Sequence, residues 1–178
     1  KKFSDFFIKN KSNVYALGCS TGELSKKIYN SHNDKNINIT GIDNSNHMIN
    51  ETKLNKTKVK FINSNIETFK FKKSDFIYSL YTMQFINSAS RQKIFDKIYN
   101  SLNWGGGFII FEKIRGADAR FQEMLTFLYY DFKSDNGFNS DEILAKERSL
   151  RGNLDPYTYN ETINFLKRAG FKDIMSIY

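Results

Sequence analysis

Short apolar runs alternate with amphipathic stretches along the first part of the chain. The runs are rich in Ile, Val, Phe and Tyr, which is typical of strands buried inside a parallel sheet. We therefore predict strands at Asn13–Leu17, Ile37–Asp43, Val59–Asn63, Asp75–Leu80 and Gly107–Glu112.

Helical patterns fill the gaps between these runs. In one of them, Ile94, Ile98 and Leu102 recur at helical spacing and form a single apolar face. Gly105-Gly106-Gly107 follow, and we expect them to end this helix, because glycine tolerates positive φ there. The alternation predicts an α/β fold with a mostly parallel sheet covered on both faces. The helices are predicted near Gly22–Ser31, Asn46–Leu54 and Ala89–Leu102.

The pattern changes after the fifth predicted strand, where helices follow one another without strands between them. Ala117–Lys133 is predicted as a long amphipathic helix, with Asn136-Gly137 as its break. Ser140 is followed by two acids, which indicates the start of a second helix. We expect residues of about 113–157 to form a helical insertion over the carboxyl ends of the strands.

A last helix begins at the capping box of Thr158 and Glu161 and ends at Ala169-Gly170. The final residues, Ile174–Tyr178, resemble a strand, and the sequence begins with Lys1. We expect a single domain over residues 1–178, with further residues of the protein at both ends.

Composition narrows the class of protein. A hydrophobic content of 40% with 17 phenylalanines favours a folded globule over disorder. No apolar run approaches the ~20 residues that cross a bilayer, so no membrane association is expected. The net charge is +8, but the lysines are scattered without an aromatic-interleaved basic segment, so we expect no direct contact with nucleic acid. One cysteine excludes an intramolecular disulfide and suits the cytoplasm.

Two strand ends carry the strongest chemical signal. The first predicted strand runs into the small-residue turn Gly18–Gly22, and the second ends at Asp43. Small residues let the backbone approach a ligand, and a carboxylate there can accept hydrogen bonds from both ribose hydroxyls. Ser20 stands where a dinucleotide fingerprint has its second glycine, which favours a nucleoside without a pyrophosphate, such as S-adenosylmethionine. An ordinary turn with a helix-capping acid is the competing interpretation.

Further polar residues are weaker candidates. Asn65 follows the third strand, where it could accept from an adenine amino group while Ile66 covers the ring; a polar loop residue is equally expected. Cys19 has no neighbouring cation to lower its pKa, so a nucleophile is not expected. His32 and His47 are predicted in solvent near helix ends, and we expect no metal site.

Several segments match one family closely. The chain resembles the carboxy-S-adenosylmethionine synthase family, whose members have the Rossmann-like class I methyltransferase fold. The likeness runs from about residue 13 to the end, and the later segments are not shared with ordinary methyltransferases. The matching segments are Val14–Ser20, Ile42–Ser45, Thr82–Phe85, Asp96–Tyr99, Glu112-Lys113, Tyr130–Lys133, Asn136-Gly137 and Lys146–Ser149.

The resemblance implies a reaction. S-adenosylmethionine and prephenate would give carboxy-S-adenosylmethionine and phenylpyruvate, with the carbon dioxide from prephenate captured by a sulfonium ylide. The product would feed a second enzyme that builds 5-oxyacetyluridine at the wobble position of certain tRNAs. The resemblance also implies a cytoplasmic homodimer, with the insertion as a candidate contact surface.

The resemblance further assigns roles to individual residues. The turn would line the methionine part of the cofactor, and residues after the second and third strands would hold the ribose and adenine. Taken alone, Arg148 is a surface arginine; by resemblance it pairs with the added carboxylate, which suits its planar guanidinium. The implied cofactor-binding residues are Gly18, Cys19, Ser20, Asp43, Asn44, Asn65, Ile66 and Leu80, with Arg148 as the catalytic residue.

Three positions depart from the family. It has an acid at Ala16, an aspartate at Asn65 and an asparagine at Leu80. Without the acid at Ala16 the cofactor's amino group loses an anchor, and one charge-assisted hydrogen bond is worth about 1.5–3 kcal/mol. Two alternatives therefore stand beside the synthase: a small-molecule S-adenosylmethionine-dependent methyltransferase, and a non-catalytic nucleoside-binding relative.

Overall fold

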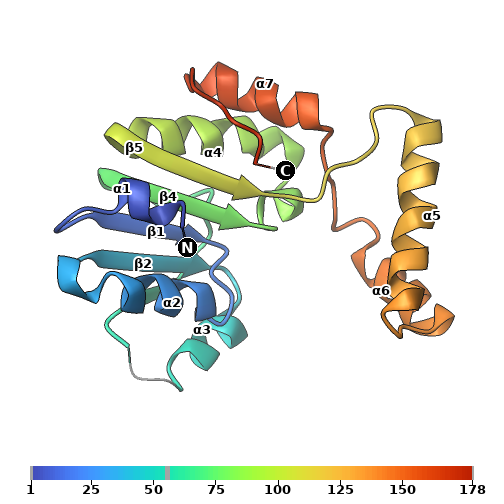
Figure 1. Cartoon of the computed structure of the whole chain (residues 1–178), viewed down its shortest axis with the longest axis horizontal. Coiled ribbons are helices and arrows are strands. Elements are labelled where there is room, and N and C mark those ends of the chain that lie inside the picture. Colours follow the sequence, from blue (N-terminus) through green and yellow to red (C-terminus); the bar gives the residue numbers. More distant parts are fainter. Residues whose placement is uncertain (1, 55–56, 178) are drawn as a thin grey trace.

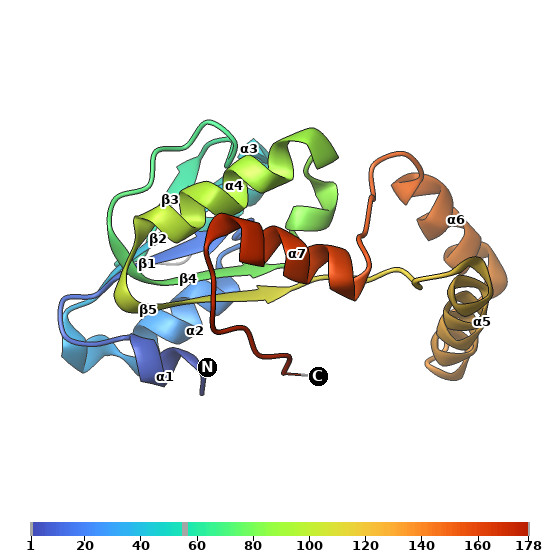
Figure 2. The same cartoon turned by 90° about the horizontal axis from the view of Figure 1, so that it is seen from above.

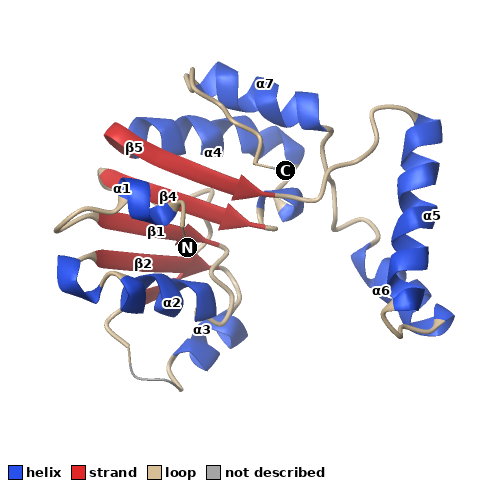
Figure 3. Ribbon diagram, in the orientation of Figure 1, coloured by secondary structure: helices blue, strands red, loops and turns tan. Residues whose placement is uncertain are grey.

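Five parallel strands form one sheet in the order β3-β2-β1-β4-β5 (Figures 1 and 3). The computed structural model describes residues 2–54 and 57–177. Strand order reverses direction between β1 and β4, which is where open α/β sheets bind ligands, beyond the carboxyl ends. The predicted fold class is confirmed. The strands are β1 (Asn13–Leu17), β2 (Asn38–Asp43), β3 (Lys60–Asn63), β4 (Ser74–Leu80) and β5 (Leu102–Phe111).

Helices cover both faces of the sheet because successive strand residues point to opposite sides. Tyr15 and Leu17 of β1 pack in one core cluster with Ile98 and Leu166. Val14 and Ala16 pack in a second cluster on the other face. The helices that bring these residues together are α1 (Ser4–Phe7), α2 (Glu23–Ser31), α3 (Asn46–Thr52), α4 (Ser88–Ser101) and α7 (Tyr159–Ala169), with short turns η1 (Asn33–Lys35) and η2 (Met83–Phe85).

The boundary between α4 and β5 differs from the prediction. Leu102 was expected in the helix, but its backbone is extended and it begins β5. The three glycines therefore lie inside the strand instead of ending the helix. Ser74 pairs with Leu102 while Phe76 pairs with Gly107, so the residues between them bulge out of the ladder. Glycine suits such a bulge because one of these residues, Gly105, has φ +75°.

The segment after α7 is not the predicted strand. Residues 171–177 form neither helix nor strand, and Tyr178 lies outside the described residues. Phe171 and Ile174 pack against the first core cluster instead. Burial of these apolar side chains places the segment beside β5 without a strand ladder between the two.

Two helices extend beyond the carboxyl ends of the strands, α5 (Ala119–Asp135) and α6 (Ser140–Leu150). We call residues 113–157 the helical arm. Both views show α5 and α6 as a pair set apart from the sheet and its covering helices (Figures 1 and 2). No residue of α5 is buried, and Ile143 is the buried residue of α6. The cap of α6 is Asn139, which forms a capping box with Glu142, one residue before the predicted Ser140.

Candidate nucleoside-binding site

The turn after β1 is held in a conformation that needs glycine. Gly18 has φ +63°, and a Cβ built there would collide with the side chain of Thr82. Gly22 has φ +78°, and a Cβ there would collide with the ring of Phe61. The hydroxyl of Thr82 donates to the carbonyl oxygen of Leu17 at 3.0 Å. The turn is therefore held by Thr82, just after β4, on one side and by Phe61 of β3 on the other.

Asp43 connects the first two strand ends. One carboxylate oxygen accepts from the N–H of Ser20 at 2.8 Å, and the other accepts from the N–H of Ser45 at 2.9 Å. Ser45 is also the cap of α3, where its hydroxyl accepts from Met48 N–H at 3.3 Å. Each carboxylate oxygen has a further lone pair, so Asp43 can still accept from two ribose hydroxyls. The geometry suits the role expected of it.

Cys19 is a residue of this turn and is partly buried. Burial, together with the negative charge of Asp43, raises the pKa of its thiol to about 12. The thiol is therefore protonated at neutral pH, which makes a nucleophile role untenable. It contributes shape and a close contact to the turn.

The remaining predicted cofactor residues lie along the same edge of the sheet. Asn44 is exposed directly after β2, and Ile66 is buried after β3. Asn65 accepts the N–H of Glu67 through its side-chain oxygen at 2.8 Å, so that oxygen has one acceptor site left. Leu80 ends β4 and packs against the second core cluster.

The chain has Ala16 where the resemblance implies an acid. Ala16 is fully buried in β1, and its register partner on β4 is Tyr78. The hydroxyls of Tyr78 and Ser25 lie 2.8 Å apart, and both residues are buried. Burial raises the pKa of Tyr78, so this pair is neutral. The register partner of Ala16 is therefore part of an uncharged pair of hydroxyls.

Arg148 is not brought to this edge within a single chain. It is exposed on α6, in the helical arm, whereas the other predicted residues sit at the ends of β1–β4. Figure 1 shows α6 separated from the sheet.

Glu112 and Thr82 were not predicted as site residues. Glu112, just after β5, accepts the backbone N–H groups of Thr82, Met83 and Gln84 at 3.1, 2.9 and 3.0 Å. Burial raises the pKa of Glu112, while these hydrogen bonds and nearby Arg91 oppose the rise. Glu112 thus fixes the loop whose Thr82 supports Gly18. Both residues fall in segments that match the family, which is the one signal that could have singled them out.

The histidines are placed differently from each other. His32 was predicted in solvent, but its side chain is 1% exposed, with Nδ1 2.9 Å from Ile28 O and Nε2 2.8 Å from an oxygen of Asp5. It packs where α2 meets α1, so the prediction was wrong; His47 is exposed. Within residues 2–54 and 57–177, no three His, Cys, Asp or Glu side chains gather to bind a metal, and no helix has the length and apolarity to span a bilayer.

Sequence comparison finds close relatives. A family model described as a methyltransferase domain matches residues 14–106. The carboxy-S-adenosyl-L-methionine synthase of Staphylococcus epidermidis is 39% identical over 177 residues, covering 98% of this chain and 77% of that protein. The protein of the same name from Campylobacter lari is 38% identical over 176 residues, covering 97% and 74%.

Comparison with solved structures supports the fold. Cyclopropane synthase MmaA2 from Mycobacterium tuberculosis superimposes with a TM-score of 0.68 at 15% identity, over 95% of this chain and 57% of that chain. At this identity the likeness shows a shared fold and nothing more.

Proposed function

The chain belongs to the carboxy-S-adenosyl-L-methionine synthase family, and on that premise we propose that it converts S-adenosylmethionine and prephenate to carboxy-S-adenosylmethionine and phenylpyruvate. The observation that carries the proposal is the match over nearly the whole chain, arm included, to proteins of that name. Prephenate loses carbon dioxide and hydroxide as its ring becomes aromatic. The hydroxide takes a proton from the sulfonium methyl group and becomes water. The carbon of the resulting ylide then bonds to the carbon dioxide, which becomes the new carboxylate. Atoms and charge balance without a further reactant.

The chain's residues fit S-adenosylmethionine at the carboxyl edge of the sheet. At Gly18 and Gly22 the space for a side chain is filled by Thr82 and Phe61, which fixes the turn that we propose contacts the methionine part. Asp43 keeps free lone pairs for the ribose after holding Ser20 and Ser45. Asn44, Asn65 and Ile66 follow the neighbouring strands on the side where adenine would lie.

Arg148 gives the site its specificity in this proposal. The product carries a carboxylate that S-adenosylmethionine lacks, and a guanidinium matches a carboxylate with two parallel hydrogen bonds. Since α6 lies apart from the sheet in the single chain, this pairing requires α6 to meet a nucleoside site, either its own or that of a second copy.

The activity assay compares two arginines of the arm. Arg148→Leu is expected to lower the rate of carboxy-S-adenosylmethionine formation at least about a hundredfold, because a buried charge pair contributes on the order of 3 kcal/mol. The product is measured by mass spectrometry. Arg151→Leu, an exposed arginine just after α6, is the matched control and should retain the wild-type rate. Equal rates for Arg148→Leu and the wild type would refute this role.

The two alternatives differ from the synthase in ways that can be measured. A small-molecule methyltransferase would form S-adenosylhomocysteine with a methyl acceptor and would not need Arg148. A non-catalytic relative would bind S-adenosylmethionine and its carboxylated form equally, at millimolar concentration. The neutral Tyr78–Ser25 pair behind Ala16 favours weaker cofactor binding than in the family, which keeps the second alternative open to calorimetry.

The chain also has a surface suited to self-association. Phe121, Leu125, Leu128 and Phe132 lie on α5 and are 46% to 62% exposed. Exposed apolar patches of this kind mark interfaces in soluble proteins. We therefore include in the proposal a homodimer formed through the arm, working in the cytoplasm and supplying its product to an enzyme that modifies wobble uridine in tRNA.

A further inference from the structure

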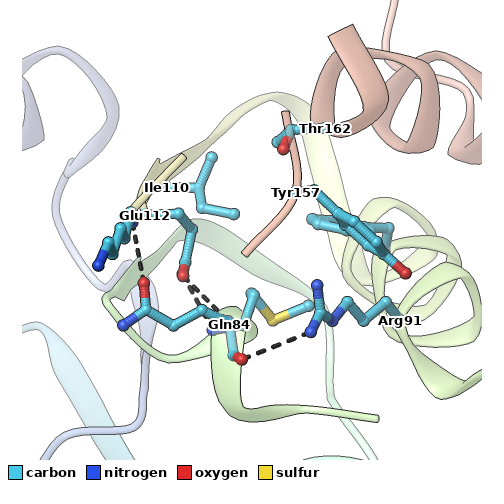
Figure 4. A pocket seen from close by; sticks show the side chains of 9 residues that line it. Gln84, Arg91, Ile110, Glu112, Tyr157 and Thr162 are labelled. Atoms are coloured by element: carbon cyan, nitrogen blue, oxygen red, sulfur yellow. Dashed lines mark hydrogen bonds between the residues drawn. The ribbon is translucent and has the colours of Figure 1, made fainter. Parts of the chain in front are cut away.

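Both ends of the helical arm return to one cluster beside the carboxyl edge of the sheet, in which Gln84 and Arg91 are buried. We call Gln84, Arg91, Glu112, Asp155 and Tyr157 the arm-base cluster. Glu112 and Lys113 lead out of β5 into the arm, and Asp155 to Tyr157 lead back to α7. Figure 4 shows the side chains of Gln84, Arg91, Glu112 and Tyr157 around a small cavity of about 20 Å³, large enough for one water molecule.

Gln84 contacts both linkers of the arm, the outgoing one at Lys113 and the returning one at Asp155. Its side-chain oxygen accepts the N–H of Lys113 at 2.9 Å, and its backbone oxygen accepts the N–H of Asp155 at 2.9 Å. Its own N–H donates to Glu112 at 3.0 Å. Gln84 is 8% exposed, so these bonds are sheltered from water.

Arg91 completes the cluster from α4 and is 2% exposed. Its guanidinium donates to the carbonyl oxygens of Ile86 at 2.8 Å and Gln84 at 3.4 Å. It forms an ion pair with Asp155 at 3.2 Å and lies 4.2 Å from the ring centre of Tyr157. The guanidinium of this buried arginine thus binds η2, the residue just after it and the segment that returns from the arm.

A short stretch of chain with its own backbone hydrogen bonds connects α6, which carries Arg148, to this cluster. The N–H of Arg151 donates to Arg148 O at 3.3 Å, and the N–H of Leu154 donates to Leu150 O at 3.0 Å. Asp155 comes next and is held by Gln84 and Arg91. On the other side, Glu112 holds Thr82, which supports Gly18. The cluster therefore lies between the nucleoside turn and α6.

We propose that Arg91 and Gln84 are positioning residues that fix the base of the arm, and through it Arg148, relative to the nucleoside-binding edge of the sheet. The inference rests on the proposed function, because it concerns how Arg148 is presented to the carboxylate. Neither residue touches the substrate in this account; they act by holding the linker at Asp155.

The test loosens the returning linker without disturbing the core. Asp155→Ala removes the ion pair at a side chain that is 59% exposed, so the fold is retained. Asp155→Asn keeps an acceptor for Arg91 and should be milder. Asp34→Ala, an exposed acid on η1 near the amino ends of the strands, is the control for the change in net charge. Calorimetry measures the dissociation constants of S-adenosylmethionine and carboxy-S-adenosylmethionine, and amide hydrogen exchange follows the linkers.

Asp155→Ala is expected to weaken carboxy-S-adenosylmethionine binding by roughly two- to fivefold, the range for a partly exposed ion pair, and to leave S-adenosylmethionine binding unchanged. Exchange should accelerate at residues 113–116 and 154–158. If the wild type prefers the carboxylated nucleoside and Asp155→Ala keeps the whole preference, the inference is overturned and the proposed function stands. If the wild type itself shows no preference, the proposed function fails, and the inference with it.

Discussion

Asp43 accepts hydrogen bonds from two segments at the proposed nucleoside-binding edge, the turn after β1 and the start of α3. Asp43→Asn places an amide group against the N–H of Ser20 or Ser45 and removes the charge. We expect S-adenosylmethionine binding to weaken about ten- to a hundredfold, the range for a charge-assisted hydrogen bond. Calorimetry measures it, with Asp34→Asn as the control. An unchanged dissociation constant would place the ribose elsewhere.

Cys19 offers a test by pH. With its pKa raised to about 12, the folded protein carries roughly a thousandfold less thiolate near pH 7.5 than free cysteine. Iodoacetamide should therefore label Cys19 very slowly at that pH and faster as the pH rises beyond 10, and labelling should be rapid after unfolding in urea. Labelling of the folded protein at the rate of free cysteine near pH 7.5 would contradict the burial described here.

At the scale of residues, the sequence predicts side chains that local spacing explains. Gly18 and Asp43 could be proposed from the sequence because Gly18 directly follows β1 and Asp43 ends β2. Glu112 was not, because its task is to accept three backbone N–H groups from a loop distant along the chain. His32 was misplaced for the same reason: nothing near it in sequence shows that α1 covers it.

Among the elements, α7 depends on its capping box. Thr158 Oγ1 accepts the N–H of Glu161 at 3.2 Å and donates to its carboxylate at 2.8 Å. Thr158→Ala should reduce the free energy of unfolding by about 0.5–2 kcal/mol. Urea denaturation measures this, and Ser149→Ala, an exposed hydroxyl on α6, should have a smaller effect.

The same capping box has a predictable pH dependence. Hydrogen bonds from the Thr158 N–H and hydroxyl lower the pKa of Glu161 in the folded state. Its contribution is therefore present above the unfolded pKa of about 4.3 and is lost as the pH falls through the lower folded value. The difference between Thr158→Ala and the wild type should shrink between pH 7 and pH 3. A difference that stays constant would show that the carboxylate is not involved.

Elements were predictable where local signals agree. Three features appear as expected: the carboxyl ends of the first four predicted strands, the Thr158 capping box and the break at Asn136-Gly137. The start of β5 was not predicted, because glycines after Leu102 are compatible both with the end of a helix and with a bulge in a strand. Pairing with β4 decides between the two. The tail at 171–177 was misread because apolar residues suit a strand and a packed segment equally.

For the whole molecule, the exposed apolar side chains of α5 predict a homodimer formed through the arm. Leu128→Glu introduces a charge on α5 at a side chain that is 62% exposed in the single chain. We expect the wild type to sediment as a dimer and the variant as a monomer with an unchanged melting temperature. Leu54→Glu, at a leucine 74% exposed outside the arm, should remain dimeric. A wild type that stays monomeric at high concentration would contradict the dimer.

Sequence alone predicted the layers of the fold, because alternating strands and helices allow few topologies. It could not place the arm: the amphipathic pattern of α5 predicts an apolar face but does not say what covers it. In the single chain no residue of α5 is buried. The position of Arg148 relative to the proposed nucleoside site therefore depends on what covers α5 and α6.

The most direct test of the account is mass spectrometry of a mixture of the purified protein, S-adenosylmethionine and prephenate labelled with ¹³C in its ring carboxylate. The account predicts a sulfonium nucleoside heavier than S-adenosylmethionine by one labelled carboxyl group, formed together with phenylpyruvate. Label released only as free carbon dioxide, or S-adenosylmethionine recovered unchanged, would contradict it.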